Sequence, residues 1–276
     1  MITVTAILVV SLIVIYADYR MTVHNANVVW NGRGSVELVL RAKASLPAQH
    51  RVLVPWLSNL TDYYWVRWFA ITASLFASWG YYTTCMDQPI LGVTMLALYY
   101  IWAALFDYSE GYLEVAFFAF FMFWASSVGS NPGMIAMGVL AGLNRETSVF
   151  IPVFLILDGY LMAGVLTGAG VGVGIAIPKI MHPNAKRYCT LNMFKTNWGR
   201  LTTSFKTSEY YLHNVWVNFI VLFLIIIATL TLLPLTALHY GVAVLFCLLL
   251  IPTIWGEIRV FAPVVLFLIP LIGSVL

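Results

Sequence analysis

The sequence predicts an all-α fold, a bundle of transmembrane helices that crosses the bilayer repeatedly, and three observations support this. Hydrophobic residues make up 62% of the chain and charged residues only 9%, whereas a soluble domain carries roughly a quarter charged residues. The mean hydropathy is +0.91. The apolar runs extend for about 15–20 residues without polar alternation, whereas a β-barrel would show alternating segments of about 10 residues. We therefore expect a single integral membrane domain over residues 1–276, a polytopic bundle with about 9–10 membrane segments.

The first membrane segment is expected at residues 2–17, where an apolar run follows Met1 directly. This run lacks the basic n-region and the small-residue cleavage site of a signal peptide, so we expect it to be retained as a span. A first polar loop, residues 19–63, follows. Inside it, residues 35–44 (SVELVLRAKA) have the pattern of a short amphipathic helix at the membrane interface. Residues 46–60 predict a structured loop or an interfacial helix, because two prolines bracket an apolar segment.

The remaining apolar runs predict the other membrane segments. They are expected at residues 64–82, 90–106, 111–128, 134–143, 213–235, 240–255 and 260–276, with a second polar loop at 182–212. Residues 149–179 allow two interpretations, either one long crossing or two short crossings that turn at Asp158–Gly159. Within them, the glycine-rich stretch 168–174 (GAGVGVG) favours close helix packing.

The side of the membrane on which each loop lies depends on that choice. With two crossings in 149–179, loops 19–63 and 182–212 and the Glu257–Arg259 pair share one face, which we expect to be the outer one. Both termini would then lie in the cytoplasm. We prefer this arrangement because it gathers nearly every charge on one face, as a large cavity at a membrane surface requires. The positive-inside rule favours the opposite orientation, since it places the Lys- and Arg-rich face in the cytoplasm.

Four acidic residues are candidates for chemistry. Asp107, Glu110 and Glu114 are spaced i, i+3, i+7, so they would share one face of a helix. Such a set could supply a general base or hold a divalent metal, the one cofactor that the sequence suggests. It could equally be a solvated helix start, where the helix dipole favours acids. Asp18 closes the first apolar run, either as an ordinary span terminus or as a carboxylate at the mouth of a cavity. We expect the catalytic residues to be Asp18, Asp107 and Glu110.

Paired charges flank several of the expected spans. Arg145 and Glu146 separate two apolar runs, and Arg51 lies inside an apolar segment of the first loop. Such charges either form salt bridges that fix helix ends, or their arginine binds a phosphate, for which the planar guanidinium is suited. The histidines and cysteines show no metal-ligand spacing. We expect the substrate-binding residues to be Arg51, Glu114, Asn144, Arg145, Glu146, Glu257 and Arg259.

Four short motifs, PAQHRVLVPWL, FDYSE, LNRETSVFIP and GEIRVFAPV, occur in this order along the chain. Together they resemble bacterial polytopic glycosyltransferases of the GT-C type, which depend on polyprenyl-phosphate sugars. The resemblance covers about residues 47–265. It implies an acidic catalytic base at the edge of the first external loop, which by position is Asp18, and it implies that Arg145 contacts the phosphate of the donor. The chain is short for the class, and the paired acidic signature usual in the first loop is not evident here.

The function that this resemblance implies is transfer of a sugar from a lipid-phosphate carrier to an acceptor at the outer face of the bacterial cytoplasmic membrane. The partners would be the lipid bilayer, a polyprenyl-phosphate-linked sugar and an acceptor. Nucleic acid is not expected, and membrane protein partners are an open option. The alternative is a non-catalytic membrane subunit of a larger complex, including an inactive relative of such transferases. A small transporter is a weaker alternative, because Asp158 alone is a candidate for a mid-span charge and no paired broken helices are evident.

Overall fold

The computed structural model describes residues 2–24, 51–103, 110–183, 210–250 and 261–274. Every regular element within these ranges is helical, so the all-α prediction is confirmed for this part of the chain. A 3-10 turn, η2 (Glu146–Val149), joins two of the helices. The helices are α1 (Ile2–His24), α3 (Leu53–Leu60), α4 (Tyr63–Cys85), α5 (Pro89–Ala103), α6 (Glu110–Ser127), α7 (Gly133–Asn144), α8 (Phe150–Leu157), α9 (Leu161–Met181), α11 (Tyr210–Leu232), α12 (Ala237–Leu249) and α13 (Ala262–Gly273).

Two of the described helices are long and apolar enough to cross a membrane. They are the stretch Thr3–Arg20 within α1 and the whole of α9. Seven further apolar helical stretches in the described residues have between 10 and 17 residues, which is shorter than the roughly 20 that a helix needs to span the hydrocarbon core. The two long helices therefore support membrane association, and the number of about 9–10 membrane segments stays a prediction.

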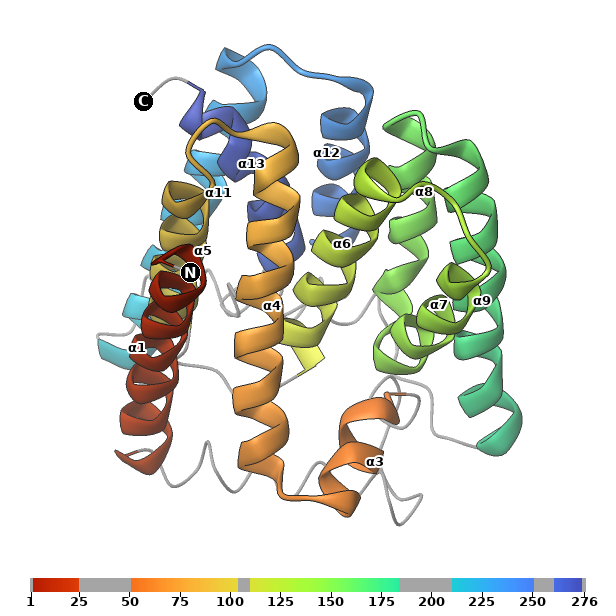
Figure 1. The fold of residues 1–276 in the computed structure, drawn as a ribbon. Helices are drawn as coiled ribbons and strands as arrows, with labels where there is room; N and C mark the ends of the chain where they lie inside the picture. Colours follow the sequence, from red (N-terminus) through yellow and green to blue (C-terminus); the bar gives the residue numbers. More distant parts are fainter. Residues whose placement is uncertain (1, 25–50, 104–109, 184–209, 251–260, 275–276) are drawn as a thin grey trace.

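The helices run through the bundle in alternating directions (Figure 1). As drawn, α1 descends, α4 rises, α5 descends and α6 rises. The lower end of the bundle gathers α3, the start of α4 and the ends of α7 and α9, whereas the end of α13 lies at the upper end. The chain leaves α1 after His24 and α9 after Met181, in both cases at the lower end of the helix. Both polar loops are thus attached at the same end, as the two-crossing interpretation predicts.

Residues 149–179 form two helices that meet at a turn, as the two-crossing interpretation requires, and the crossings themselves stay a prediction. The turn follows α8 and contains Gly159, whose φ of 92° lies in the left-handed region that favours glycine. The N–H of Tyr160 donates to the carbonyl of Leu155 (2.8 Å), and the N–H of Gly159 donates to Ile156 (3.1 Å). These two bonds are the Schellman arrangement that closes a helix, and they allow α9 to pack back along α8.

Glycines bring the backbones of α7 and α9 close together, as the GAGVGVG stretch predicts. A Cβ atom placed on Gly170 would lie 2.1 Å from the carbonyl oxygen of Ile135, and one on Gly174 would lie 2.2 Å from that of Val139. On the facing helix, a Cβ on Gly142 would lie 2.5 Å from the carbonyl oxygen of Val171. Real Cβ atoms do not approach this closely, so the two helices pack through small residues in the manner of membrane helix pairs.

Aromatic rings occupy the centre of the bundle. Phe118 of α6, Phe154 of α8 and Phe267 of α13 are all fully buried. Their ring centroids lie 5.6, 5.9 and 5.1 Å apart in pairs, with the Phe154–Phe267 pair edge to face. This is the preferred spacing of aromatic pairs. The cluster fixes the C-terminal helix α13 against two helices from the middle of the chain.

Two predicted boundaries in the N-terminal part differ from the structure or lie outside it. The helix predicted for residues 2–17 continues to His24, so Asp18 lies inside α1 rather than at its end. For residues 46–60 we predicted either a structured loop or a helix, and the described part of this segment forms the helix Leu53–Leu60. The amphipathic helix predicted at residues 35–44 lies outside the described residues.

Candidate functional site

Several predicted site residues meet at the lower end of the bundle, where the LNRET motif leaves α7. Arg145 and Thr147 of this motif contact Glu114 of α6, and Glu146 contacts Arg51, which lies two residues before the start of α3. We call Arg51, Glu114, Arg145, Glu146 and Thr147 the NRET cluster.

Glu114 lies at the centre of the NRET cluster, one turn into α6. Its carboxylate accepts hydrogen bonds from Nη1 of Arg145 and from the hydroxyl of Thr147. The residue is only 1% exposed, and a buried carboxylate without partners is costly. Arg145 supplies the compensating charge and is itself 9% exposed. The pair is therefore a nearly enclosed ion pair, with a threonine hydroxyl as an additional donor.

The backbone at the end of α7 explains why Arg145 and Thr147, two positions apart, reach the same carboxylate. α7 ends at Asn144, and Arg145 follows in an extended conformation with φ −156° and ψ 149° before η2 begins. The Ser148 hydroxyl then donates to the carbonyl of Ala141 at 2.7 Å, which holds η2 against the last turn of α7. Asn144 itself is completely buried. The chain reversal thus directs Arg145 and Thr147 toward α6.

Arg51 and Glu146 form the more exposed part of the NRET cluster. Nε of Arg51 lies 3.4 Å from Oε2 of Glu146, and the side chains are 24% and 35% exposed. The backbone supports this contact, because the N–H of Val52 donates to the carbonyl of Leu143 at 3.1 Å. The adjacent residues Arg145 and Glu146 therefore each pair with a residue from a different segment of the chain, Glu114 and Arg51 respectively. Arg51 is the cation of the cluster that solvent or a ligand reaches most easily.

Asp18 forms a second buried ion pair, with Arg67 of α4. Nε and Nη2 of Arg67 donate to the two carboxylate oxygens at 2.7 and 2.6 Å, which is the bidentate arrangement. Asp18 is 1% exposed and Arg67 is completely buried. The pair explains why α1 continues through Asp18, since the carboxylate is neutralised within the bundle rather than by water at a helix end.

Aromatic residues surround the guanidinium of Arg67. Nη1 of Arg67 lies 3.5 Å from the hydroxyl of Tyr63, and Cζ lies 5.5 Å from the ring centroid of Tyr112, within the range of a cation–π contact. Tyr112 belongs to α6 and precedes Glu114 by two residues. The start of α6 therefore contacts the Asp18–Arg67 pair through Tyr112 and the NRET cluster through Glu114.

The other predicted site residues are only partly described. Asp107, Glu257 and Arg259 lie outside the described residues, and Glu110 is the first residue of α6. Among the residues that the structure does describe, no three His, Cys, Asp or Glu side chains come together as a metal site. The divalent-metal alternative for Asp107, Glu110 and Glu114 stays a prediction, because most of that set is not described.

Sequence reasoning missed two contributors to these sites, Arg67 and Thr147. Arg67 interrupts the apolar run of α4, and a charge inside such a run demands a partner of opposite sign. That rule could have identified Arg67, and the acidic residue at the end of the first apolar run was an available partner. Thr147 had no comparable signal, because a threonine next to a charged motif is common.

No protein-family model matches the chain, and neither the curated proteins nor the solved structures contain a match to it.

Proposed function

We propose that this protein is an integral membrane glycosyltransferase, which transfers a sugar from a lipid-phosphate carrier to an acceptor at the membrane face that bears the polar loops. The observation that carries the proposal is the NRET cluster. Here the LNRET motif meets the PAQHRVLVPWL motif through the Arg51–Glu146 contact, so two of the motifs on which the resemblance to GT-C transferases rests meet at one end of the bundle. The bacterial cytoplasmic membrane is part of the proposal.

The cluster brings two arginines, each paired with a glutamate, to the end of the bundle where a lipid phosphate would depart. In such a transfer, the acceptor hydroxyl oxygen bonds to the anomeric carbon while the bond from that carbon to the phosphate oxygen breaks. Negative charge then develops on the phosphate, and cations aimed at it stabilise the transition state. Arg51 is the best placed to contact the phosphate, because its side chain is 24% exposed. Arg145 is neutralised by Glu114, so a contact between Arg145 and the phosphate would require the phosphate to replace that carboxylate.

A carboxylate must accept the proton of the acceptor hydroxyl. Asp18 is the leading candidate by its position relative to the first loop, followed by Asp107 and Glu110. Each carboxylate oxygen has two lone pairs, so a carboxylate bound bidentately by Arg67 retains acceptor capacity. Because Asp18 is almost fully buried, the acceptor would have to open the packing around α1 and α4 to reach it.

A non-catalytic membrane subunit is the second candidate, and the Asp18–Arg67 pair favours it. A fully enclosed, bidentate ion pair between two helices is a common way to fix helix orientation. On this account both buried ion pairs serve the architecture, and the exposed charges of the lower end contact a partner protein.

Binding of polyprenyl phosphate by the purified full-length protein tests the first proposal. We expect saturable binding, measured by native mass spectrometry, and at least about tenfold weaker binding for Arg51→Ala, because a charge-assisted contact is lost. Arg20→Ala is the matched control, since it removes an exposed arginine near the same end of the bundle. Membranes containing the wild type should also transfer sugar from a polyprenyl-phosphate donor. Absence of both binding and transfer would make the subunit account the preferred one.

A further inference from the structure

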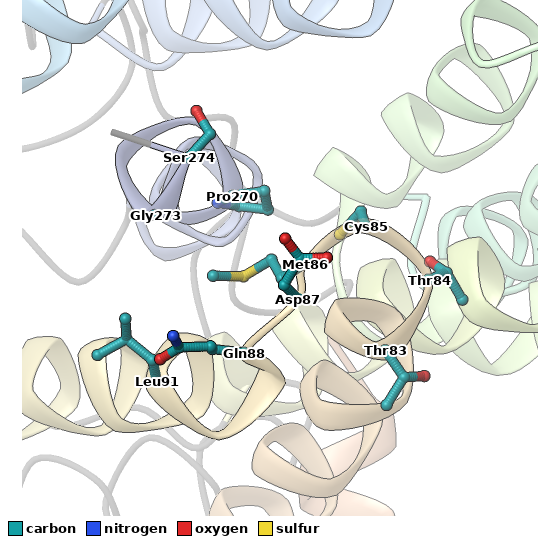
Figure 2. A pocket seen from close by; sticks show the side chains of 10 residues that line it. All are labelled: Thr83, Thr84, Cys85, Met86, Asp87, Gln88, Leu91, Pro270, Gly273 and Ser274. Atoms are coloured by element: carbon teal, nitrogen blue, oxygen red, sulfur yellow. The ribbon is translucent and has the colours of Figure 1, made fainter. Parts of the chain in front are cut away.

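A cavity of about 650 Å³ lies at the upper end of the bundle, away from the NRET cluster. The last turn of α4, the turn that leads into α5 and the end of α13 form its wall (Figure 2). Its volume is in the range of small-molecule sites, about 300–1,000 Å³. The proposed transferase chemistry does not use this end of the molecule.

Three hydroxyl groups line the cavity, and all three use their protons within the protein. Thr83 donates to the carbonyl of Gly80 at 2.6 Å, and Thr84 donates to Tyr81 at the same distance. Ser274 donates to the carbonyl of Leu271 at 2.7 Å. Because each hydroxyl has one proton, the groups that remain for a ligand are the oxygen lone pairs. These side chains therefore present hydrogen-bond acceptors.

The cavity also has negative electrostatic character. Asp87 is the one charged residue among those that line it, and its exposed carboxylate has no hydrogen bond or ion pair within the described residues. α4 ends at Cys85 and α13 ends at Gly273, so the C-terminal ends of two helices border the cavity. A helix C-terminus carries roughly half a negative charge in its free carbonyl groups.

Charge is distributed unequally over the described part of the molecule. Asp87 and Asp158 lie in two of the turns at the upper end, those that follow α4 and α8. The described lysine and arginine residues all lie in segments at or near the lower end, namely Arg20, Arg51, Arg67, Arg145 and Lys179. No described cation therefore competes with a ligand for Asp87.

We propose that this cavity binds a primary ammonium group, carried either by a small soluble amine or by a lipid headgroup. An ammonium has a positive charge and N–H donors, which complement the Asp87 carboxylate and the C-terminal ends of α4 and α13 that border the cavity. A quaternary ammonium carries the same charge but has no N–H donors. The lining therefore discriminates between ethanolamine and choline.

Binding of ethanolamine to the purified protein in detergent tests the soluble form of the ligand. We expect saturation-transfer NMR to show binding of ethanolamine that is at least about tenfold tighter than that of choline, because charge-assisted hydrogen bonds are lost with choline. Asp87→Asn should weaken ethanolamine binding by about tenfold or more. Asp158→Asn should leave it unchanged, because it removes a charge from the same end but does not line the cavity.

Nanodiscs distinguish the lipid source. If the ammonium belongs to a headgroup, the wild type should retain phosphatidylethanolamine over phosphatidylcholine in native mass spectrometry, and Asp87→Asn should lose that preference. If free ethanolamine binds and neither lipid is preferred, the ligand is a soluble amine. The proposal is wrong if neither ethanolamine nor phosphatidylethanolamine binds selectively, or if Asp87→Asn binds them as the wild type does.

Discussion

At the scale of single residues, the described part of the bundle encloses the ion pairs Asp18–Arg67 and Glu114–Arg145. Removing an ion from water costs several kcal/mol even after relaxation, and only good geometry with further hydrogen bonds compensates for it. Arg67 meets this condition by donating two hydrogen bonds to Asp18 and by lying against Tyr112. Glu114 meets it with the additional hydroxyl of Thr147.

We predict that Asp18→Leu and Arg67→Met each destabilise the protein by about 3–5 kcal/mol, because each leaves an uncompensated buried charge. The double variant Asp18→Leu/Arg67→Met should recover most of this loss, since two apolar side chains of similar size then fill the site. Thermal unfolding of the wild type, the two single variants and the double variant in detergent, followed by tryptophan fluorescence, measures the coupling energy between Asp18 and Arg67.

The same double variant separates stability from catalysis. If it folds and still transfers sugar at the wild-type rate, Asp18 is not the base. If the two single variants are as stable as the wild type, loss of one partner does not leave a costly buried charge, and the stability prediction is wrong.

Asp158 is a second residue whose charge affects stability. It caps the C-terminal end of α8, where the helix dipole disfavours a negative charge, and partial burial raises the pKa of its carboxyl group. When the pKa in the folded state is above that in the unfolded state, the ionised carboxylate lowers the free energy of unfolding once the pH exceeds both values. Stability should therefore fall as the pH rises from the ordinary aspartate pKa through the raised one.

We predict that Asp158→Asn removes this pH dependence and is more stable than the wild type at pH 7 by a fraction of a kcal/mol. At a pH below both pKa values the two proteins should be equally stable. Unfolding midpoints measured over a series of pH values give the comparison, and an equal difference at all pH values would contradict the interpretation.

At the scale of elements, glycines determine how α7 and α9 pack. Lipid gives no hydrophobic driving force between helices, so close backbone contact has to supply the attraction. Gly138 and Gly142 of α7 face Gly170 and Gly174 of α9, with the backbones in direct contact. The glycines of α9 are not equivalent, since a Cβ on Gly172 would have no atom within 4 Å.

We predict that Gly174→Ala destabilises the protein by about 1–3 kcal/mol, because the added methyl group overlaps the carbonyl of Val139 and forces the helices apart. Gly172→Ala is the matched control in the same helix and should be neutral or slightly stabilising. Resistance to unfolding in a detergent titration measures both variants. Equal effects of the two substitutions would show that the α7–α9 contact is not close.

At the scale of the whole molecule, the alternating helices separate the two ends of the bundle. Both polar loops are attached at the lower end, whereas the turns after α4, α6 and α8 lie at the upper end (Figure 1). Of the two interpretations of residues 149–179, only the one with two helices gives this arrangement.

We predict that cysteines introduced at Thr61 and His182 are labelled from the same side of the membrane, and a cysteine at Ser130 from the opposite side. The background is a variant in which the native cysteines are replaced by serine. An impermeant maleimide applied to intact cells and to inverted vesicles distinguishes the sides. Labelling of the Thr61 and His182 positions from opposite sides would contradict the two-crossing topology, and the pattern also decides whether the polar-loop face is outer or cytoplasmic.

The sequence alone determined the features that depend on local composition. Long apolar runs predicted helices, since a buried backbone must satisfy its own hydrogen bonds. The glycine stretch 168–174 predicted close packing, and Asp158–Gly159 marked the turn between α8 and α9. Each of these follows from residues that are neighbours in the chain.

The tertiary structure alone decided which charges pair with one another. The partners are 49 residues apart in Asp18–Arg67, 31 in Glu114–Arg145 and 95 in Arg51–Glu146. Local pattern suggested instead that Arg145 and Glu146 could bridge each other, because they are adjacent. Which side chain a buried charge meets depends on which helices pack together, and that packing is set by contacts between distant segments, such as the glycines of α7 and α9 and the rings of α6, α8 and α13.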